Sequence, residues 1–96
     1  MLKHIVFMKF KATVTTSEIE EIKQGLESLP AVIPEIKGFE FGQDILHTER
    51  SWDFALVSTF ENVDAMKRYQ VNPDHQVVVK KVRAICDSLV VVDFNF

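Results

Sequence analysis

Four stretches of the chain have the composition of β-strands, and in the first three apolar side chains recur at every second position. They are residues 2–10 (LKHIVFMKF), 39–45 (FEFGQDI), 52–60 (WDFALVSTF) and 88–96 (SLVVVDFNF). Gly42 in the second stretch predicts a β-bulge, because glycine inside a strand often marks irregular backbone. The first, third and fourth stretches carry apolar residues on both faces. Both faces of the sheet are therefore expected to be covered.

Between these strands the apolar spacing changes to three and four residues, which predicts helices. Residues 15–29 carry one apolar stripe, formed by Ile19, Ile22, Leu26 and Leu29. Two pairs have the spacing of a capping box at its start, namely Thr15 with Glu18 and Ser17 with Glu20. Pro30 and Pro34 are expected to end this helix.

A second helical region runs through VDAMKRY after an Asn62 cap and breaks at Asn72-Pro73, because proline disfavours helical geometry in the residue before it. A further helix restarts there, with Asn72 as N-cap and Pro73 in the first position. Its buried stripe is Val78, Val82 and Ile85.

The element order is β-α-β-β-α-β, which predicts one α+β domain over residues 1–96 with the ferredoxin-like fold. Four antiparallel strands would carry both helical regions on one face. No third layer is available for the other face, so an identical sheet from a second copy is the simplest cover. We therefore expect a homodimer, a dimeric α/β barrel that encloses a space between two sheets.

Composition excludes several classes of protein. The 96 residues carry a formal charge of −3, without the basic excess that binding to nucleic acid requires. Cys86 is the only cysteine, so no internal disulfide forms. Lys9 and Lys11 interrupt the early apolar run, which argues against a signal peptide and favours the cytoplasm. Apolar runs such as LVVV are far shorter than the roughly 20 residues of a membrane span, so no membrane partner is expected.

The segment YQVNPDHQ (69–76) holds the only tyrosine and one of three histidines. His75 would be the third residue of a helix, where the positive helix end disfavours protonation of its ring. A neutral His75 could accept a proton from carbon while the Tyr69 hydroxyl donates a hydrogen bond to the developing enolate. Alternatively, His75 bonds a backbone carbonyl near the break and Tyr69 is packed with a satisfied hydroxyl.

His4 shares a strand face with Val6 and Met8, and this face is expected to turn toward the space between the sheets. His4 could line a pocket there or be an ordinary hydrogen-bonded core residue. No metal site is predicted, because no carboxylate spacing supplies a third ligand to His4 and His75. Cys86 has no cationic sequence neighbour except Arg83, which argues against a nucleophilic role.

Five segments together resemble the stress-responsive α/β-barrel domain family, often shortened to Dabb. They are LKHIVFMKF (2–10), LPAVIPEIKGFEFGQD (29–44), DFALVSTFENVDAMKRY (53–69), NPDH (72–75) and VVVDF (90–94). The resemblance implies a homodimer in which two ferredoxin-like sheets form a barrel. It implies little about activity, because some members are stress-linked proteins without demonstrated catalysis.

The chain is also similar to a plant polyketide cyclase of this family, which uses a tyrosine and a histidine for an aldol cyclisation without a cofactor. By this resemblance the catalytic pair falls on Tyr69 and His75, and a strand-one histidine falls on His4. A further pocket histidine falls on Phe54, which removes one polar group from the expected cavity. The other pocket positions implied are Val6, Met8, Leu56, Val78 and Cys86.

Three functions follow as hypotheses. The first is a homodimer that binds a small, mostly apolar molecule in the inter-sheet cavity without turnover. The second is a cofactor-independent lyase, cyclase or isomerase, with His75 as base, Tyr69 as hydrogen-bond donor and His4 orienting the substrate. The third is a structural dimer without a ligand. An open cavity into which His75 and Tyr69 both point would discriminate among them.

Overall fold

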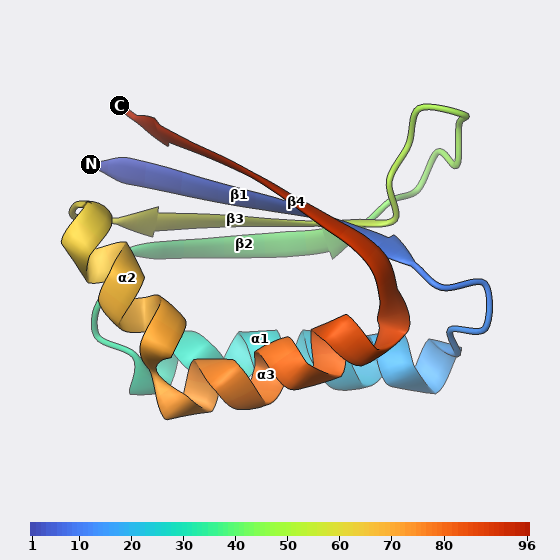
Figure 1. Cartoon of the computed structure of the whole chain (residues 1–96), viewed down its shortest axis with the longest axis horizontal. Coiled ribbons are helices and arrows are strands. Elements are labelled where there is room, and N and C mark those ends of the chain that lie inside the picture. The colour runs from blue at the N-terminus through green and yellow to red at the C-terminus, as the bar shows by residue number, and fades with distance from the viewer.

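The computed structural model describes residues 1–96, which form a four-stranded antiparallel sheet with three helices on one face (Figure 1). The strands are β1 (Leu2–Phe10), β2 (Gly38–Gln43), β3 (Phe54–Phe60) and β4 (Cys86–Asn95). The helices are α1 (Thr16–Val32), α2 (Val63–Val71) and α3 (Pro73–Ile85). With the strand order β2-β3-β1-β4, the predicted ferredoxin-like α+β fold is confirmed.

Helix α1 begins where the first of the two capping boxes predicts. The Thr15 hydroxyl accepts the Glu18 N–H at 3.2 Å, and the Glu18 carboxylate accepts the Thr15 N–H at 3.0 Å. The predicted stop at Pro30 is wrong, because the helix continues to Val32. Pro30 lies in the last turn, where its missing N–H removes one helical hydrogen bond. Burial of Leu29 and Ile33 in the core keeps the backbone helical past this residue. The helix then ends before Pro34, as predicted.

The strand ends differ from the pattern in the loop between β2 and β3. Strand β2 stops at Gln43, so Ile45 lies outside the sheet and is 84% exposed. Strand β3 starts at Phe54, which leaves Trp52 in the loop. Strand β4 begins at Cys86, directly after α3 and two residues earlier than the pattern indicates.

The predicted bulge at Gly42 is wrong, because Gly42 pairs with Ala55 in an uninterrupted register. The irregularity lies instead where β1 pairs with β4: Lys9 pairs with Ser88 but Phe10 pairs with Cys86, so Asp87 of β4 is the extra residue. There the Phe10 N–H donates to the Asp53 carboxylate at 2.7 Å. A side chain thus accepts the backbone N–H at the irregular step, which meets the requirement that such groups be hydrogen-bonded.

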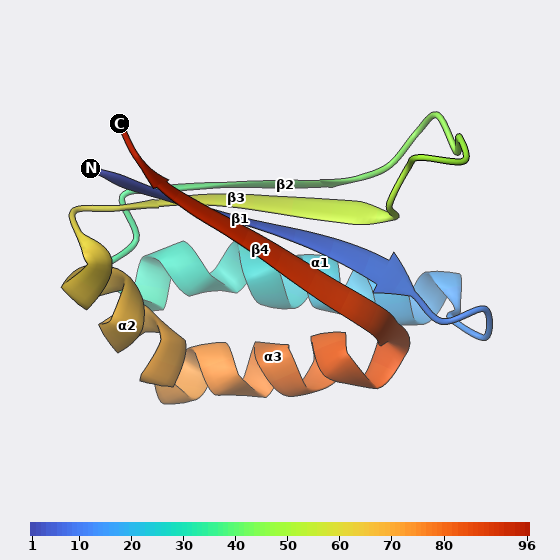
Figure 2. The same cartoon turned by 45° about the horizontal axis from the view of Figure 1, so that its top comes forward.

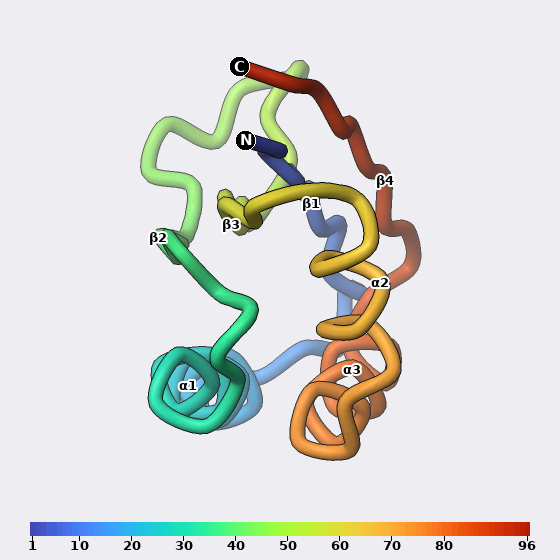
Figure 3. Tube along the Cα trace, turned by 90° about the vertical axis from the view of Figure 1, so that its left-hand side faces the viewer, coloured from blue at the N-terminus to red at the C-terminus, as the bar shows by residue number.

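The helices cover the face of the sheet that carries the even-numbered residues of β1. Figure 3 shows α1 and α3 side by side beneath this face. Leu2, His4 and Met8 are buried there, whereas Phe7 on the opposite face is 40% exposed. The prediction that His4, Val6 and Met8 turn toward a second sheet is therefore wrong, since the chain's own helices cover them.

The other face of the sheet carries no helix (Figure 2). Its exposed apolar side chains are Phe7, Val90, Val92 and Phe94, which lie opposite one another or in phase on β1 and β4. We call this surface the outer face. None of the three helices combines the length and the apolar composition needed to cross a lipid bilayer.

Candidate functional site

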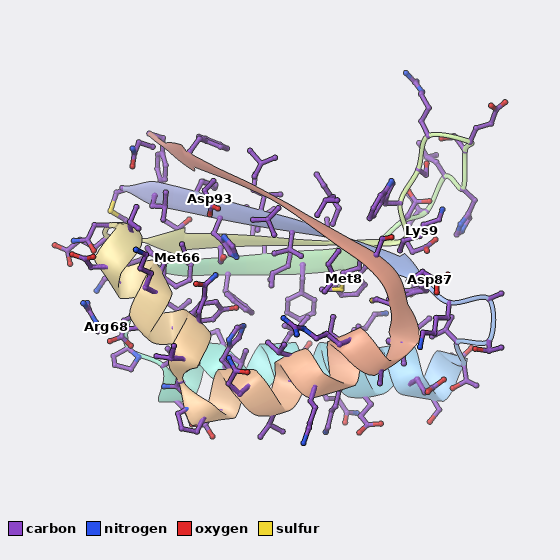
Figure 4. The ribbon with its side chains drawn as sticks, in the orientation of Figure 1. Met8, Lys9, Met66, Arg68, Asp87 and Asp93 are labelled. Atoms are coloured by element: carbon purple, nitrogen blue, oxygen red, sulfur yellow. The ribbon has the colours of Figure 1, made fainter.

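A cavity of about 160 Å³ lies between the sheet and the helices. Most of its lining side chains are hydrophobic, and seven of the residues singled out by the sequence line it: His4, Val6, Met8, Leu56, Tyr69, His75 and Val78. Met8 points from the sheet toward the helices (Figure 4). The three polar rings of the predicted site thus meet at one space, but this space lies inside one chain and not between two sheets.

The break between α2 and α3 places Tyr69 next to His75. Asn72 has extended backbone geometry, and its side-chain oxygen accepts the Asp74 N–H at 2.9 Å, so Asn72 caps α3 as predicted. Pro73 occupies the start of α3, where a missing N–H costs nothing. Tyr69 in the last turn of α2 and His75 in the first turn of α3 then lie with ring centroids 4.0 Å apart.

His75 is held in one tautomer by the backbone at this break. Its Nδ1 lies 3.2 Å from the carbonyl oxygen of Gln70, which can only accept, so Nδ1 carries the proton. The Gln70 carbonyl also accepts a hydrogen bond from the Gln76 side chain. In the neutral ring Nε2 is therefore the unprotonated nitrogen. The bond to a backbone carbonyl and the position at a cavity were alternatives in the sequence, and the structure has both.

Burial lowers the pKa of His75 below its ordinary value. The hydrogen bond to the Gln70 carbonyl opposes this shift, and the nearby His4 ring adds to it. The direction agrees with the prediction, but the main cause is desolvation and not the helix dipole. His75 is consequently a neutral base near pH 7.

Tyr69 is 1% exposed and packs against Phe60 with ring centroids 4.8 Å apart. The Tyr69 hydroxyl forms no hydrogen bond with another protein group. Every fully buried side-chain oxygen or nitrogen has a hydrogen-bond partner, so this hydroxyl is not fully buried. The hydroxyl must therefore retain access to the cavity that Tyr69 lines. Burial raises the pKa of Tyr69, so this hydroxyl stays protonated and can donate.

His4 is fixed by a carboxylate that was not among the predicted site residues. Its Nδ1 donates to Asp93 Oδ1 at 2.5 Å, across the register pair that joins β1 to β4. Ser58 on β3 donates to the His4 carbonyl at 3.0 Å. Asp93 extends from β4 beside β1 (Figure 4). The sequence held a signal for this contact, because Asp93 is the one acidic residue in the apolar run VVVDF. Asp93 lies directly opposite His4 once the first and last strands pair.

Two residues predicted to bind the ligand lie outside the cavity. Phe54 is buried in the core and stacks on Phe41 with centroids 6.0 Å apart. The polar group that the resemblance implied to be lost at Phe54 therefore does not concern this cavity. Cys86 lies at the junction of α3 and β4, where burial and the charges of Asp53 and Asp87 raise the pKa of its thiol to about 11. A thiol with this pKa is protonated near neutral pH and is a poor nucleophile.

Other parts of the surface offer less chemistry. No group of three His, Cys, Asp or Glu side chains lies in a metal-binding arrangement. A larger depression of about 620 Å³, next to the loop between β2 and β3, is lined by Phe7 and Trp52 but by no histidine, tyrosine or cysteine. The cavity with His4, Tyr69 and His75 is therefore the best candidate for a functional site.

Residues 2–96 match the stress responsive A/B barrel domain family, Dabb. A stress-response A/B barrel domain-containing protein of Arabidopsis thaliana is 33% identical, over 96% of this chain and 83% of the relative. Olivetolic acid cyclase of Cannabis sativa is 26% identical, over 98% of this chain and 95% of the cyclase.

Solved structures of other proteins have a similar fold. A dimeric ferredoxin-like protein of unknown function from Thermobifida fusca has a TM-score of 0.91 and 32% identity, covering 99% of this chain and 90% of that one. A second dimeric protein of unknown function with this fold, from Bacteroides fragilis, has a TM-score of 0.88 and 32% identity over 99% of this chain and 95% of its own.

Proposed function

The chain belongs to the stress responsive A/B barrel domain family, and on that premise we propose that its cavity binds a small, mostly apolar molecule carrying one or two oxygen atoms. The observation that carries this proposal is the meeting of His4, Tyr69 and His75 in an otherwise apolar cavity of about 160 Å³. A cavity of similar size in another protein holds one benzene molecule, so the ligand has about the bulk of one ring. An open cavity argues against a purely structural dimer with a collapsed core.

A second candidate is turnover without a cofactor, which the tautomer of His75 favours. Its free Nε2 would take a proton from the carbon next to a carbonyl, and the Tyr69 hydroxyl would hydrogen-bond the enolate oxygen. The enolate carbon would attack a second carbonyl, and the protonated His75 would return its proton to the new alkoxide. Olivetolic acid cyclase, named for a ring closure, is a relative at 26% identity.

His4 would orient the substrate in either case. Its Nδ1 is occupied by Asp93, so only Nε2 is free to meet a ligand oxygen. His4 and Asp93 lie on adjacent strands in one register pair, which holds the ring on a rigid support. Asp93 is thus a positioning residue in this proposal.

The homodimer is supported by the outer face. Phe7, Val90, Val92 and Phe94 expose 40–54% of their surface on the face of the sheet that no helix covers. Exposed apolar patches of this kind mark interaction sites. Because the structural relatives of this chain are described as dimeric, a second copy is the occupant that we propose.

Ligand binding is tested by titrating the protein with one-ring ketones, aldehydes and phenols and following backbone amide signals by NMR. Binding should shift the signals of residues around Tyr69 and His75. The variant Tyr69→Phe should weaken binding of a carbonyl compound, whereas Ser88→Ala, which removes a hydroxyl outside the cavity, should not. If no compound shifts these signals, the binding proposal fails and a structural dimer is left.

Turnover is tested without knowing the natural substrate. A ketone that binds the cavity is incubated with the protein in D₂O, and exchange of its α-protons is followed by NMR. A catalytic base should accelerate exchange, and His75→Gln should lower the rate by about 10²- to 10⁴-fold. The control is His47→Gln, because His47 lies in the exposed loop. Binding without any exchange would leave the first candidate and remove the second.

A further inference from the structure

The cavity has a buried end and an exposed end. Its polar rings and central apolar residues are largely buried, but three lining residues are exposed: Arg83 on α3, and Leu89 and Val91 on β4. Strand β4 leaves the end of α3 at Cys86 and diverges from it (Figure 2). The mouth of the cavity therefore lies between the C-terminal half of α3 and the edge strand β4.

Arg83 lies on the same face of α3 as His75. Residues 75, 79 and 83 are spaced by four, and all three line the cavity. His75 and Arg83 are eight positions apart in the helix, which is about 12 Å along the axis. A molecule in the cavity would thus have the imidazole at one end and a guanidinium at the other.

No acidic side chain neutralises Arg83. The ion pairs of the helices are Lys81 with Glu21 and Arg68 with Glu35, and Arg83 forms none. Asp87 lies nearby, since it lines a shallow surface depression together with Arg83, but it makes no ion pair with it. In a chain with a net charge of −3, the mouth of this cavity thus keeps an unpaired, permanently charged donor.

We propose that Arg83 selects ligands with a carboxylate, so that the cavity takes a small apolar carboxylic acid whose anion binds Arg83 at the mouth. This inference rests on the proposed function and adds the charge class of its ligand. A guanidinium can bind both oxygens of a carboxylate, which a solvated lysine does less well. The apolar body fills the cavity, and the far end of the ligand lies against Tyr69 and His75.

The test compares two probes of nearly the same shape, the anion phenylacetate and the neutral phenylacetamide. Dissociation constants for each are measured by NMR titration of the full chain at low ionic strength. The acid should bind wild type about three- to tenfold more tightly than the amide, because Arg83 meets it at a partly exposed site. The variant Arg83→Gln should abolish this preference, read as the ratio of the two dissociation constants, and Arg83→Lys should retain part of it.

The matched control is Lys80→Gln, which removes the same charge from the same helix at a residue that does not line the cavity. This variant should keep the preference for phenylacetate, and higher salt should reduce it in wild type. If both probes bind the cavity but Arg83→Gln leaves their ratio unchanged, Arg83 is only a solvated rim charge and this inference falls while the proposed function stands. If neither probe nor any neutral carbonyl compound binds, both fall.

Discussion

Both faces of the sheet carry apolar side chains, but the two faces differ in what covers them. On the helix-covered face Leu56 and Phe60 are at most 4% exposed, and the cavity with three polar rings lies there. On the outer face Phe7 and Val92 remain 40% and 54% exposed. The polar side chains of the candidate site thus lie where the chain's own helices exclude water. The outer face offers only an apolar surface to a partner.

The largest expected effect on the free energy of unfolding comes from truncating one phenylalanine on each face of the sheet. Phe60→Ala should lower the free energy of unfolding by about 3–5 kcal/mol at every protein concentration, because it removes a fully buried ring. Phe7→Ala should lower it by an amount that grows with protein concentration, since its contacts form only in the dimer. Denaturant unfolding at two concentrations measures both. An equal loss for Phe7→Ala at both concentrations would contradict the proposed interface, and Phe60→Leu replaces Phe60→Ala if the latter does not fold.

The next largest effect is expected on the dissociation constant of the proposed homodimer. Val92→Lys should weaken the dimer by about 2–4 kcal/mol, because it places a charge without a partner in an apolar contact. Val71→Lys is the matched control, since Val71 is 75% exposed at the end of α2 and away from the outer face. Sedimentation equilibrium at micromolar concentration reads the dissociation constant. Equal behaviour of the two variants would show that the outer face is not the interface.

A smaller effect is expected behind the cavity, at Asp93. Asp93→Asn should cost about 1 kcal/mol of stability, since the carboxylate is 39% exposed and part of its bond to His4 is screened by solvent. It should also remove the preference for a protonated Nδ1 on His4, which ¹⁵N NMR of the ring detects. Asp87→Asn on the same strand should change neither quantity, because Asp87 forms no ion pair. An unaltered His4 spectrum in Asp93→Asn would mean that the carboxylate does not set the tautomer.

The smallest effect is a pH dependence carried by His75. The folded chain resists protonation of this ring, whose pKa lies below the ordinary 6.5 that the unfolded chain shows. Between these two pKa values the unfolded state binds more protons than the folded state, so the free energy of unfolding increases with pH. The stability that neutral His75 contributes is therefore lost as the pH falls from 6.5 through the pKa of the folded state. His75→Gln should flatten this part of the stability profile, and His47→Gln should leave it. A profile that His75→Gln does not change would place the acid sensitivity elsewhere.

Local sequence signals predicted much of the fold and part of the site. The capping residues Thr15 and Asn72, and the break before Pro73, depend on neighbours within four positions, and each occurs as predicted. The same break brings Tyr69 beside His75, so their proximity could be predicted from the sequence. Pro30 shows the limit, because packing of Leu29 and Ile33 against the core outweighs one lost hydrogen bond.

The sequence by itself determined the order of elements, the helix caps and the nearness of the only tyrosine to His75, because these follow from contacts between residues close in the chain. Only the tertiary structure decided which face of β1 the helices cover, and so that the cavity lies within one chain. It alone paired His4 with Asp93, 89 positions away, and placed Arg83 at the mouth. Period-two alternation is the same on both faces of a strand, so the choice between them depends on packing between distant segments.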